Sequence, residues 1–368
     1  MTVSLDRKNP RLEDTLADIA STIEIQADFT ITHPQHKPIE LPREIQERFR
    51  QMPESVQDQY LQVKIQTLIH ELYYHSAAID EASAQSESLK AIPQLPASIE
   101  NQAIKWSKSE FYQQLRINNH CDGHFESGWL ITGTTAEGFL QVRKNDLTLH
   151  IRSDRHVLPQ EQNAQIGDTI AVKMPPQLVE PGFYTAVGSK GSINDLPSNC
   201  TIVDVYCHLN SEGALALMDR LTIELNQITI PFHFKVIYYP DNYQWCDAAV
   251  LSFSKDDYPQ VKPILANIYS QTQSYFQSTI PLFTKYLADG VGLAERPFSH
   301  DDAVKTRSQY CLQLVAQGLL DAWKANQPTP AMKLQQIRDR FTDAGIKLAQ
   351  PYLNPDSPDI YDHGIVRF

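Results

Sequence analysis

The sequence predicts an α+β protein with a central, mostly antiparallel sheet, helices packed on one face of it, and an N-terminal helical layer. Helical spacing dominates residues 1–115, strand alternation begins at Gly128, and the centre of the chain follows the order strand, helix, strand, strand, helix. We therefore expect an N-terminal helical region at 1–115 and an α+β domain at 116–368.

Two segments near the N-terminus, 11–28 and 42–82, have the spacing of amphipathic helices. In the second, the apolar residues recur every three to four positions: Val56, Tyr60, Val63, Leu68, Leu72 and Tyr73. The stretch 83–98 contains Pro and Ser and predicts a linker, and a short helix should follow and end near Leu115.

The centre of the chain gives the clearest pattern. Residues 139–142 and 147–151 flank a polar turn and predict a hairpin. Residues 201–209, 231–239 and 248–254 alternate as strands, and helices are expected at 211–227 and 260–275. Helical spacing returns over 312–341, and the last eighteen residues should be extended.

Composition excludes several classes of protein. A formal charge of −12 opposes binding to a phosphate backbone, so we expect no nucleic-acid partner. Five cysteines without a C-x-x-C pair argue against a disulfide framework or a zinc ribbon. The first residues lack the apolar core of a signal peptide, and no run of about 18 apolar residues occurs, so we expect a cytoplasmic protein without a membrane partner.

Alternation on the central strands sorts their residues into an apolar and a polar set. Successive side chains of a strand point to opposite faces, so the apolar set should pack under the helices. The polar set comprises Asp204, Tyr206 and His208 on one strand, and His233 and Lys235 with Ile237 and Tyr239 on another. A merely solvated sheet face would give the same pattern. A lysine between two phenylalanines is nevertheless a good candidate base, because partial burial favours its neutral form.

Other motifs are weak or absent. No P-loop, H-E-x-x-H, G-x-S-x-G or EF-hand pattern occurs. The Gly- and Ser-rich loop 188–192 lacks P-loop spacing and favours a plain turn. His120 and His124, with Cys121 and Asp122 between them, come nearest to a metal pattern but lack a second ligand pair, so we expect no metal.

Several long segments resemble the HopA-type type III effector family, including its bacterial and cyanobacterial relatives. The resemblance lies in residues 181–188, 209–243, 247–258 and 280–297, and it extends over about two thirds of the chain. Members of this family look distantly like phosphothreonine lyases. Some relatives resemble the lyase component of lanthipeptide-type biosynthesis of ribosomal peptides, which acts beside a separate kinase.

The resemblance implies a β-elimination of phosphate from phosphoserine or phosphothreonine in a precursor peptide, leaving dehydroalanine or dehydrobutyrine. This reaction needs a base, an acid and cations for the phosphate, but neither a cofactor nor a metal. The F-K-V of 234–236 matches the lyase strand that carries the general base, which implies that Lys235 is the base. His208 or His233 is the candidate acid, and Lys144, Lys285 and Arg307 are the candidate phosphate-binding residues.

The sequence also departs from the lyase pattern. Lyase-like relatives carry an Arg near residues 241–253 and a Tyr on the following strand, where this chain has Gln244, Trp245 and Ser252. The alternative to an enzyme is therefore a non-catalytic protein that binds the precursor peptide or scaffolds the kinase. An effector acting on a host phosphoprotein is disfavoured, because the N-terminus is not Ser-rich.

Overall fold

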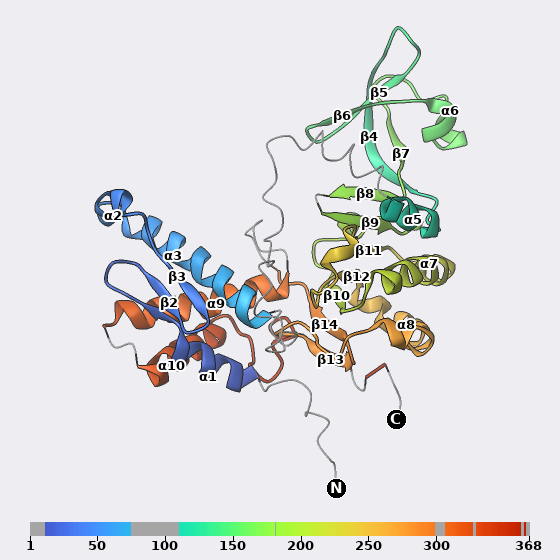
Figure 1. Cartoon of the computed structure of the whole chain (residues 1–368). Coiled ribbons are helices and arrows are strands. Elements are labelled where there is room, and N and C mark those ends of the chain that lie inside the picture. The colour runs from blue at the N-terminus through green and yellow to red at the C-terminus, as the bar shows by residue number, and fades with distance from the viewer. Residues whose placement is uncertain are drawn as a thin grey trace.

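The computed structural model confirms the predicted α+β class, with antiparallel sheets and helices. It describes residues 12–74, 110–180, 182–298, 306–326, 329–361 and 364–365. Figure 1 shows three parts: a helical body, a large sheet beside it, and a smaller sheet beyond β8. The large sheet has seven strands and the smaller sheet has four. The predicted linker at 83–98 lies outside the described residues.

The seven-stranded sheet is antiparallel throughout, in the order β13-β14-β10-β12-β11-β9-β8. Its strands are β8 (Gln177–Glu180), β9 (Phe183–Val187), β10 (Ile202–Cys207), β11 (Phe232–Ile237), β12 (Ala249–Ser254), β13 (Lys285–Ala288) and β14 (Val291–Glu295). The predicted strands at 201–209, 231–239 and 248–254 correspond to three of these, and they form the centre of the sheet.

Two helices cover one face of this sheet, α7 (Ser211–Gln227) and α8 (Tyr258–Thr272). The Asn210 side chain caps α7 by accepting a hydrogen bond from the Gly213 N–H at 2.8 Å. Leu217, Leu221 and Leu225 on the inner side of α7 are buried with Phe232 and Phe234 of β11. Another short helix, α5 (Glu110–Asn118), packs on α7.

The four-stranded sheet has its own small core around Trp129 and Ile131. Its order is β6-β5-β4-β7, with β4 (His124–Thr134), β5 (Leu140–Lys144), β6 (Leu147–Ile151) and β7 (Thr169–Met174). A short helix, α6 (Ser153–His156), and a 3-10 turn (Pro159–Glu161) connect β6 to β7. The hairpin predicted at 139–151 is confirmed as β5 and β6.

The helical body draws on both ends of the chain. It contains α1 (Leu12–Thr22), α2 (Arg43–Arg50), α3 (Glu54–Ile69), a π-helical turn (His70–Tyr74), α9 (Arg307–Lys324) and α10 (Pro330–Asp343). A three-stranded sheet lies with them: β1 (Glu24–Ile25), β2 (Ile31–His33) and β3 (His36–Ile39). One core joins residues from 16–69 to residues from 283–346. The predicted ranges 1–115 and 116–368 therefore do not coincide with the boundaries of the cores.

Local sequence explains two departures from the predicted helices. The helix expected at 42–82 divides into α2 and α3, because Pro53 lacks the N–H that a continuous helix needs and stands at the N-cap of α3. The helix expected at 11–28 ends at Thr22, and residues 24–25 form β1. Among the described residues, no helix has the length and apolar character required to cross a membrane.

Candidate functional site

The candidate site lies on the face of the seven-stranded sheet opposite α7 and α8. The strand register places Asp204, Ser252 and His233 in one row across β10, β12 and β11. Tyr206, Val250 and Lys235 form the next row. Directly opposed residues of neighbouring strands share a face, so alternation correctly predicted this polar face. It is not a solvated surface, however, because Asp204, Tyr206, His208, His233 and Ser252 are all buried.

Asp204 forms an ion pair with Arg296, a residue that was not predicted to belong to the site. Arg296 binds both carboxylate oxygens of Asp204, with Nη2 at 2.6 Å from Oδ1 and Nε at 3.2 Å from Oδ2. Arg296 Nη2 also lies 3.1 Å from Ser252 Oγ, which itself donates to Asp204 Oδ1 at 2.6 Å. The serine that replaces the expected tyrosine is therefore part of a network that holds a cation beside the strand.

His233 is buried next to this network. Its Nε2 lies 2.9 Å from Ser192 Oγ. Burial and, to a smaller extent, the nearby positive charge of Arg296 lower the pKa of His233 to about 4, although Glu180 and Asp204 oppose the shift. His233 is therefore neutral at pH 7 and must gain a proton, from solvent or in response to a bound anion, to act as a strong acid.

Lys235 lies two residues from His233 on the same face of β11. Its Nζ is 2.8 Å from Glu180 Oε2 and 4.1 Å from the centre of the Phe183 ring. Both side chains of this ion pair are 37% exposed, so solvent reaches them. Lys235 can act as a base only after this ion pair opens and the ammonium loses its proton.

His208 is farther from Lys235. It follows the end of β10, and β12 separates β10 from β11, so the lateral distance is roughly 10 Å, or two strand spacings. His208 Nδ1 lies 2.7 Å from Thr279 Oγ1, and burial lowers the pKa of His208. Of the two candidate acids, His233 is thus the one that shares the surroundings of Lys235.

Two buried donors at this polar face, Arg307 Nη1 and the Tyr206 hydroxyl, have no acceptor among the described residues. Arg307 is 1% exposed; its Nε donates to the Glu295 carbonyl at 3.1 Å and its Nη2 donates to Asn354 Oδ1, but its Nη1 has no partner there. The Tyr206 hydroxyl, with which Arg307 interacts electrostatically, is also without one. Burial holds the pKa of Tyr206 well above its usual range, and Asp204 adds to this, so the hydroxyl keeps its proton. Buried donors are normally paired, and an oxyanion would satisfy both.

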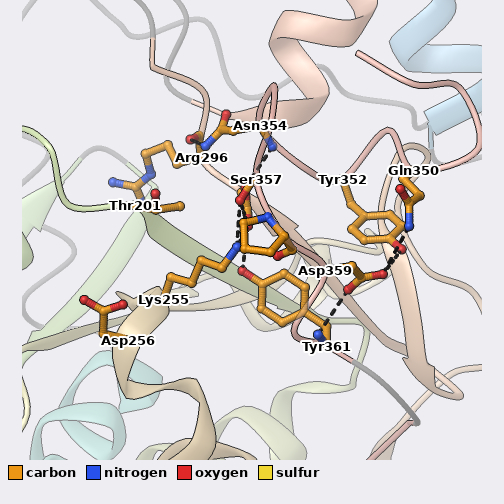
Figure 2. Close-up of polar contacts among 12 residues, drawn as sticks. Thr201, Lys255, Asp256, Arg296, Gln350, Tyr352, Asn354, Ser357, Asp359 and Tyr361 are labelled. Carbon is orange, nitrogen blue, oxygen red and sulfur yellow. Dashed lines mark hydrogen bonds and ion pairs between the residues drawn. The ribbon is translucent and has the colours of Figure 1, made fainter. Parts of the chain in front are cut away.

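Residues 350–361, which follow α10 and which we call the C-terminal segment, hold the two arginines in place. Figure 2 shows this segment beside Arg296 and Lys255. Asn354 accepts from Arg307, and its Nδ2 donates to the Arg296 carbonyl at 3.0 Å. Lys255 fastens the same segment: its Nζ lies 2.7 Å from Glu295 Oε1, 2.6 Å from Ser357 Oγ and 2.7 Å from the Pro358 carbonyl. Glu295 is fully buried. The segment thereby connects the helical body to the polar face.

The three predicted phosphate-binding residues do not converge. Lys144 lies on β5 of the four-stranded sheet and pairs with Glu126 at 2.5 Å. Lys285 lies on β13, at the other end of the molecule from β5 in Figure 1, and pairs with Asp359 at 2.7 Å. The three residues therefore do not form one site, and of the three it is Arg307 that belongs to the polar face. Lys144 is separated from the other two residues because its strand, β5, belongs to the four-stranded sheet. The residue pattern of 139–151 predicts a hairpin but not the sheet that the hairpin joins.

The weak metal pattern is also dispersed. His120 Nε2 pairs with Asp219 at 2.8 Å, whereas His124 Nε2 lies 3.8 Å from Asp195. In the described ranges, no group of three or more His, Cys, Asp or Glu residues could hold a metal ion.

The fold and this polar face define an α+β protein with a buried site of polar and cationic residues on the face of an antiparallel sheet opposite α7 and α8. Residues 174–353 match the model of the HopA1 effector protein family, which confirms the predicted family resemblance. The match contains β10, β11, β12 and β14, and therefore most of the polar face, together with Arg296 and Arg307.

Two solved structures of effector proteins are similar to this chain. The effector from Pseudomonas syringae pv. tomato strain DC3000 is 17% identical, with a TM-score of 0.39, over 70% of this chain and 83% of that one. The effector from Pseudomonas syringae pv. syringae strain 61 is 12% identical, with a TM-score of 0.39, over 81% of this chain and 97% of that one. No curated protein matches the sequence.

Proposed function

We propose that the chain is a phosphoserine or phosphothreonine lyase that acts on a phosphorylated precursor peptide, after a separate kinase. The observation that supports it most is the pair of buried donors, Arg307 Nη1 and the Tyr206 hydroxyl, on the face that carries Lys235. A phosphoryl group supplies the acceptor oxygens that these donors need. Lys235 lies in the same row of the sheet as Tyr206, two strands away, and in this proposal it reaches the adjacent carbon of the bound residue.

In the proposed reaction, Lys235 takes the Cα proton of the phosphorylated residue. The electron pair of the C–H bond forms the Cα=Cβ double bond, the Cβ–O bond breaks, and the phosphate leaves with a proton from His233. Arg307 and Tyr206 hold the phosphoryl oxygens as charge develops on them. A bound dianion also favours the protonated form of His233, because opposite charges stabilise each other.

A binding function is the second candidate, and a specific observation favours it. Lys235 and Arg296, the two other cations of the polar face, are already paired with Glu180 and Asp204. If these pairs persist in the complex, the chain would bind the precursor peptide or scaffold the kinase without changing the peptide.

A phosphothreonine peptide followed by mass distinguishes the two functions. A lyase yields a peptide lighter by one phosphoric acid, and the dehydrobutyrine formed adds thiols. Lys235→Ala should abolish this product, whereas Lys347→Ala, an exposed lysine of the helical body, should not affect it. His233→Gln should slow the elimination more than His208→Gln. An unchanged peptide mass with the wild-type protein, despite tight peptide binding, would support the binding function instead.

A further inference from the structure

The outer edge of the four-stranded sheet is left open at β6. This strand pairs with β5 on one side, and no described residue pairs with it on the other. Leu147 is 54% exposed, and Thr148 and His150 are also exposed. The strand contains no Pro, Lys, Arg or acidic residue, the residue types that natural proteins use to block strand pairing at an edge.

Two other edges of the two larger sheets are protected. At β7, Val157 forms a bridge with Val172, and the Ala171 N–H donates to Glu161 Oε2 at 2.9 Å. At β13, the Leu287 carbonyl accepts from the Ile365 N–H at 3.1 Å. The edge at β6 therefore differs from the edges at β7 and β13, because no described contact covers its outward backbone groups.

The turn before β6 determines which backbone groups point outward. Asn145 and Asp146 form a two-residue turn, with Asn145 at φ 51°, between the paired residues Lys144 and Leu147. The pair closing such a turn is hydrogen-bonded, and hydrogen-bonded and open pairs alternate along an antiparallel ladder. Thr148 and His150 are therefore in open pairs, and their N–H and C=O groups point away from β5.

The face that carries the Thr148 and His150 side chains is cationic, although the protein as a whole has a charge of −12. Thr148 pairs with Arg143, Arg143 with Leu130, and Phe125 with Lys173 across the strands. Arg143 and Lys173 form no ion pair among the described residues. No strand residue on this face is a carboxylate.

We propose that the β6 edge binds an extended, acidic peptide segment as an added strand. The Thr148 and His150 backbone groups supply the main-chain hydrogen bonds, and Arg143, which pairs with Thr148 from the neighbouring strand β5, selects carboxylates on the side chains that point to its face. A pocket of about 400 Å³ at the β4–β5 turn is lined by Thr135, Ala136, Glu137, Phe139 and His150, and its Glu137 carboxylate favours an uncharged side chain of the same segment there. This inference is independent of the proposed lyase activity.

The test uses the full chain and a short fluorescein-labelled peptide of alternating Glu and Val, followed by fluorescence anisotropy. The acidic peptide should bind, and the same peptide with Lys in place of Glu should not. Arg143→Glu should weaken binding about tenfold or more, whereas the matched control Lys347→Glu should leave it unchanged. Hydrogen exchange should slow at the Thr148 and His150 amides when the acidic peptide is present.

Thr148→Pro removes an outward N–H without removing a ladder hydrogen bond, so the sheet should keep its structure while peptide affinity falls. The proposal is overturned if Thr148→Pro binds the acidic peptide as tightly as the wild type does. It is equally overturned if acidic and basic peptides bind alike, or if neither binds. Self-association that Thr148→Pro abolishes would assign the edge to a second copy of this chain and also overturn the proposal.

Discussion

Replacing Lys255 by methionine should release the C-terminal segment from the sheet. The ammonium of Lys255 makes three contacts: with the Glu295 carboxylate at 2.7 Å, with Ser357 Oγ at 2.6 Å and with the Pro358 carbonyl at 2.7 Å. Glu295 is 0% exposed, so its carboxylate would stay buried without a counter-charge in the variant. Methionine retains most of the apolar stem of lysine, and the change therefore isolates the charge.

The size of the expected loss of stability depends on how Glu295 is stabilised once the ammonium of Lys255 is gone. Removing one partner of a buried ion pair costs about 3–5 kcal/mol, because the remaining charge is desolvated and uncompensated. Three neutral donors remain on Glu295, the Ser357 hydroxyl at 2.8 Å, the Tyr361 hydroxyl at 3.0 Å and the Asn354 N–H at 2.8 Å. They reduce the loss, so we expect the lower part of this range, about 3 kcal/mol.

Hydrogen exchange of the Tyr361 amide measures this loss locally, because its N–H is bonded to Asp359 Oδ1 at 3.1 Å within the segment. A loss of about 3 kcal/mol raises the opening equilibrium by about two orders of magnitude. Lys324→Met is the matched control: Lys324 also makes two ion pairs, with Glu54 and Asp58, but on the surface. It should leave the exchange of the Tyr361 amide unchanged.

A double variant decides whether the charge is responsible. Lys255→Met with Glu295→Leu removes both charges and should be more stable than Lys255→Met alone, because no buried charge is left unpaired. If the double variant opens as readily as the single one, or if Lys324→Met has the same effect on Tyr361, the reasoning is refuted.

Two further predictions concern the polar face and the helical body. Because the pKa of His233 is about 4 when folded and about 6.5 when unfolded, the unfolded chain binds the proton first, and stability falls as the pH drops from about 6.5 to about 4. Between pH 7 and pH 4.5 this residue should account for a loss of roughly 2–3 kcal/mol in the free energy of unfolding. Urea unfolding of His233→Gln should show a smaller loss over the same pH range by this amount. An equal loss in both proteins would contradict the burial of a neutral His233. Gly318→Ala should destabilise the helical body by about 1–3 kcal/mol in urea unfolding, since a Cβ would lie 2.6 Å from Ile337 Cα between α9 and α10, and an unchanged midpoint would show that the helices separate freely.

Local pattern predicted much of the seven-stranded sheet and its helices. The amphipathic segment 211–227 forms α7 with the predicted bounds, since its apolar stripe and the Asn210 cap act within the segment itself. Alternation likewise placed His233 and Lys235 on the face opposite Phe232 and Phe234. Both features depend on neighbouring residues alone, which is why they could be read from the sequence.

Contacts between distant segments could not be predicted in the same way. Alternation left open whether the polar face is solvated, and in the structure it is buried under Arg296, the start of α9 and the π-helical turn, whose Tyr74 interacts electrostatically with Tyr206. Arg296 was missed because a charged residue directly after an apolar strand is common. The one feature of the sequence that pointed to Arg296 was its position directly after an apolar strand that ends in Glu295. The position of Lys144 could not be predicted because its strand belongs to a separate sheet, which includes β7, about 25 residues further along the chain.

Peptide binding to the Lys235→Ala protein tests the central claim, that the polar face holds a phosphoryl group, most directly. This variant lacks the proposed base, so the phosphopeptide stays intact during isothermal titration calorimetry. A phosphothreonine peptide should bind at least about tenfold more tightly than its unphosphorylated form, and adding Arg307→Met should remove most of that difference. Equal affinities of the Lys235→Ala protein for the two peptides would contradict the claim.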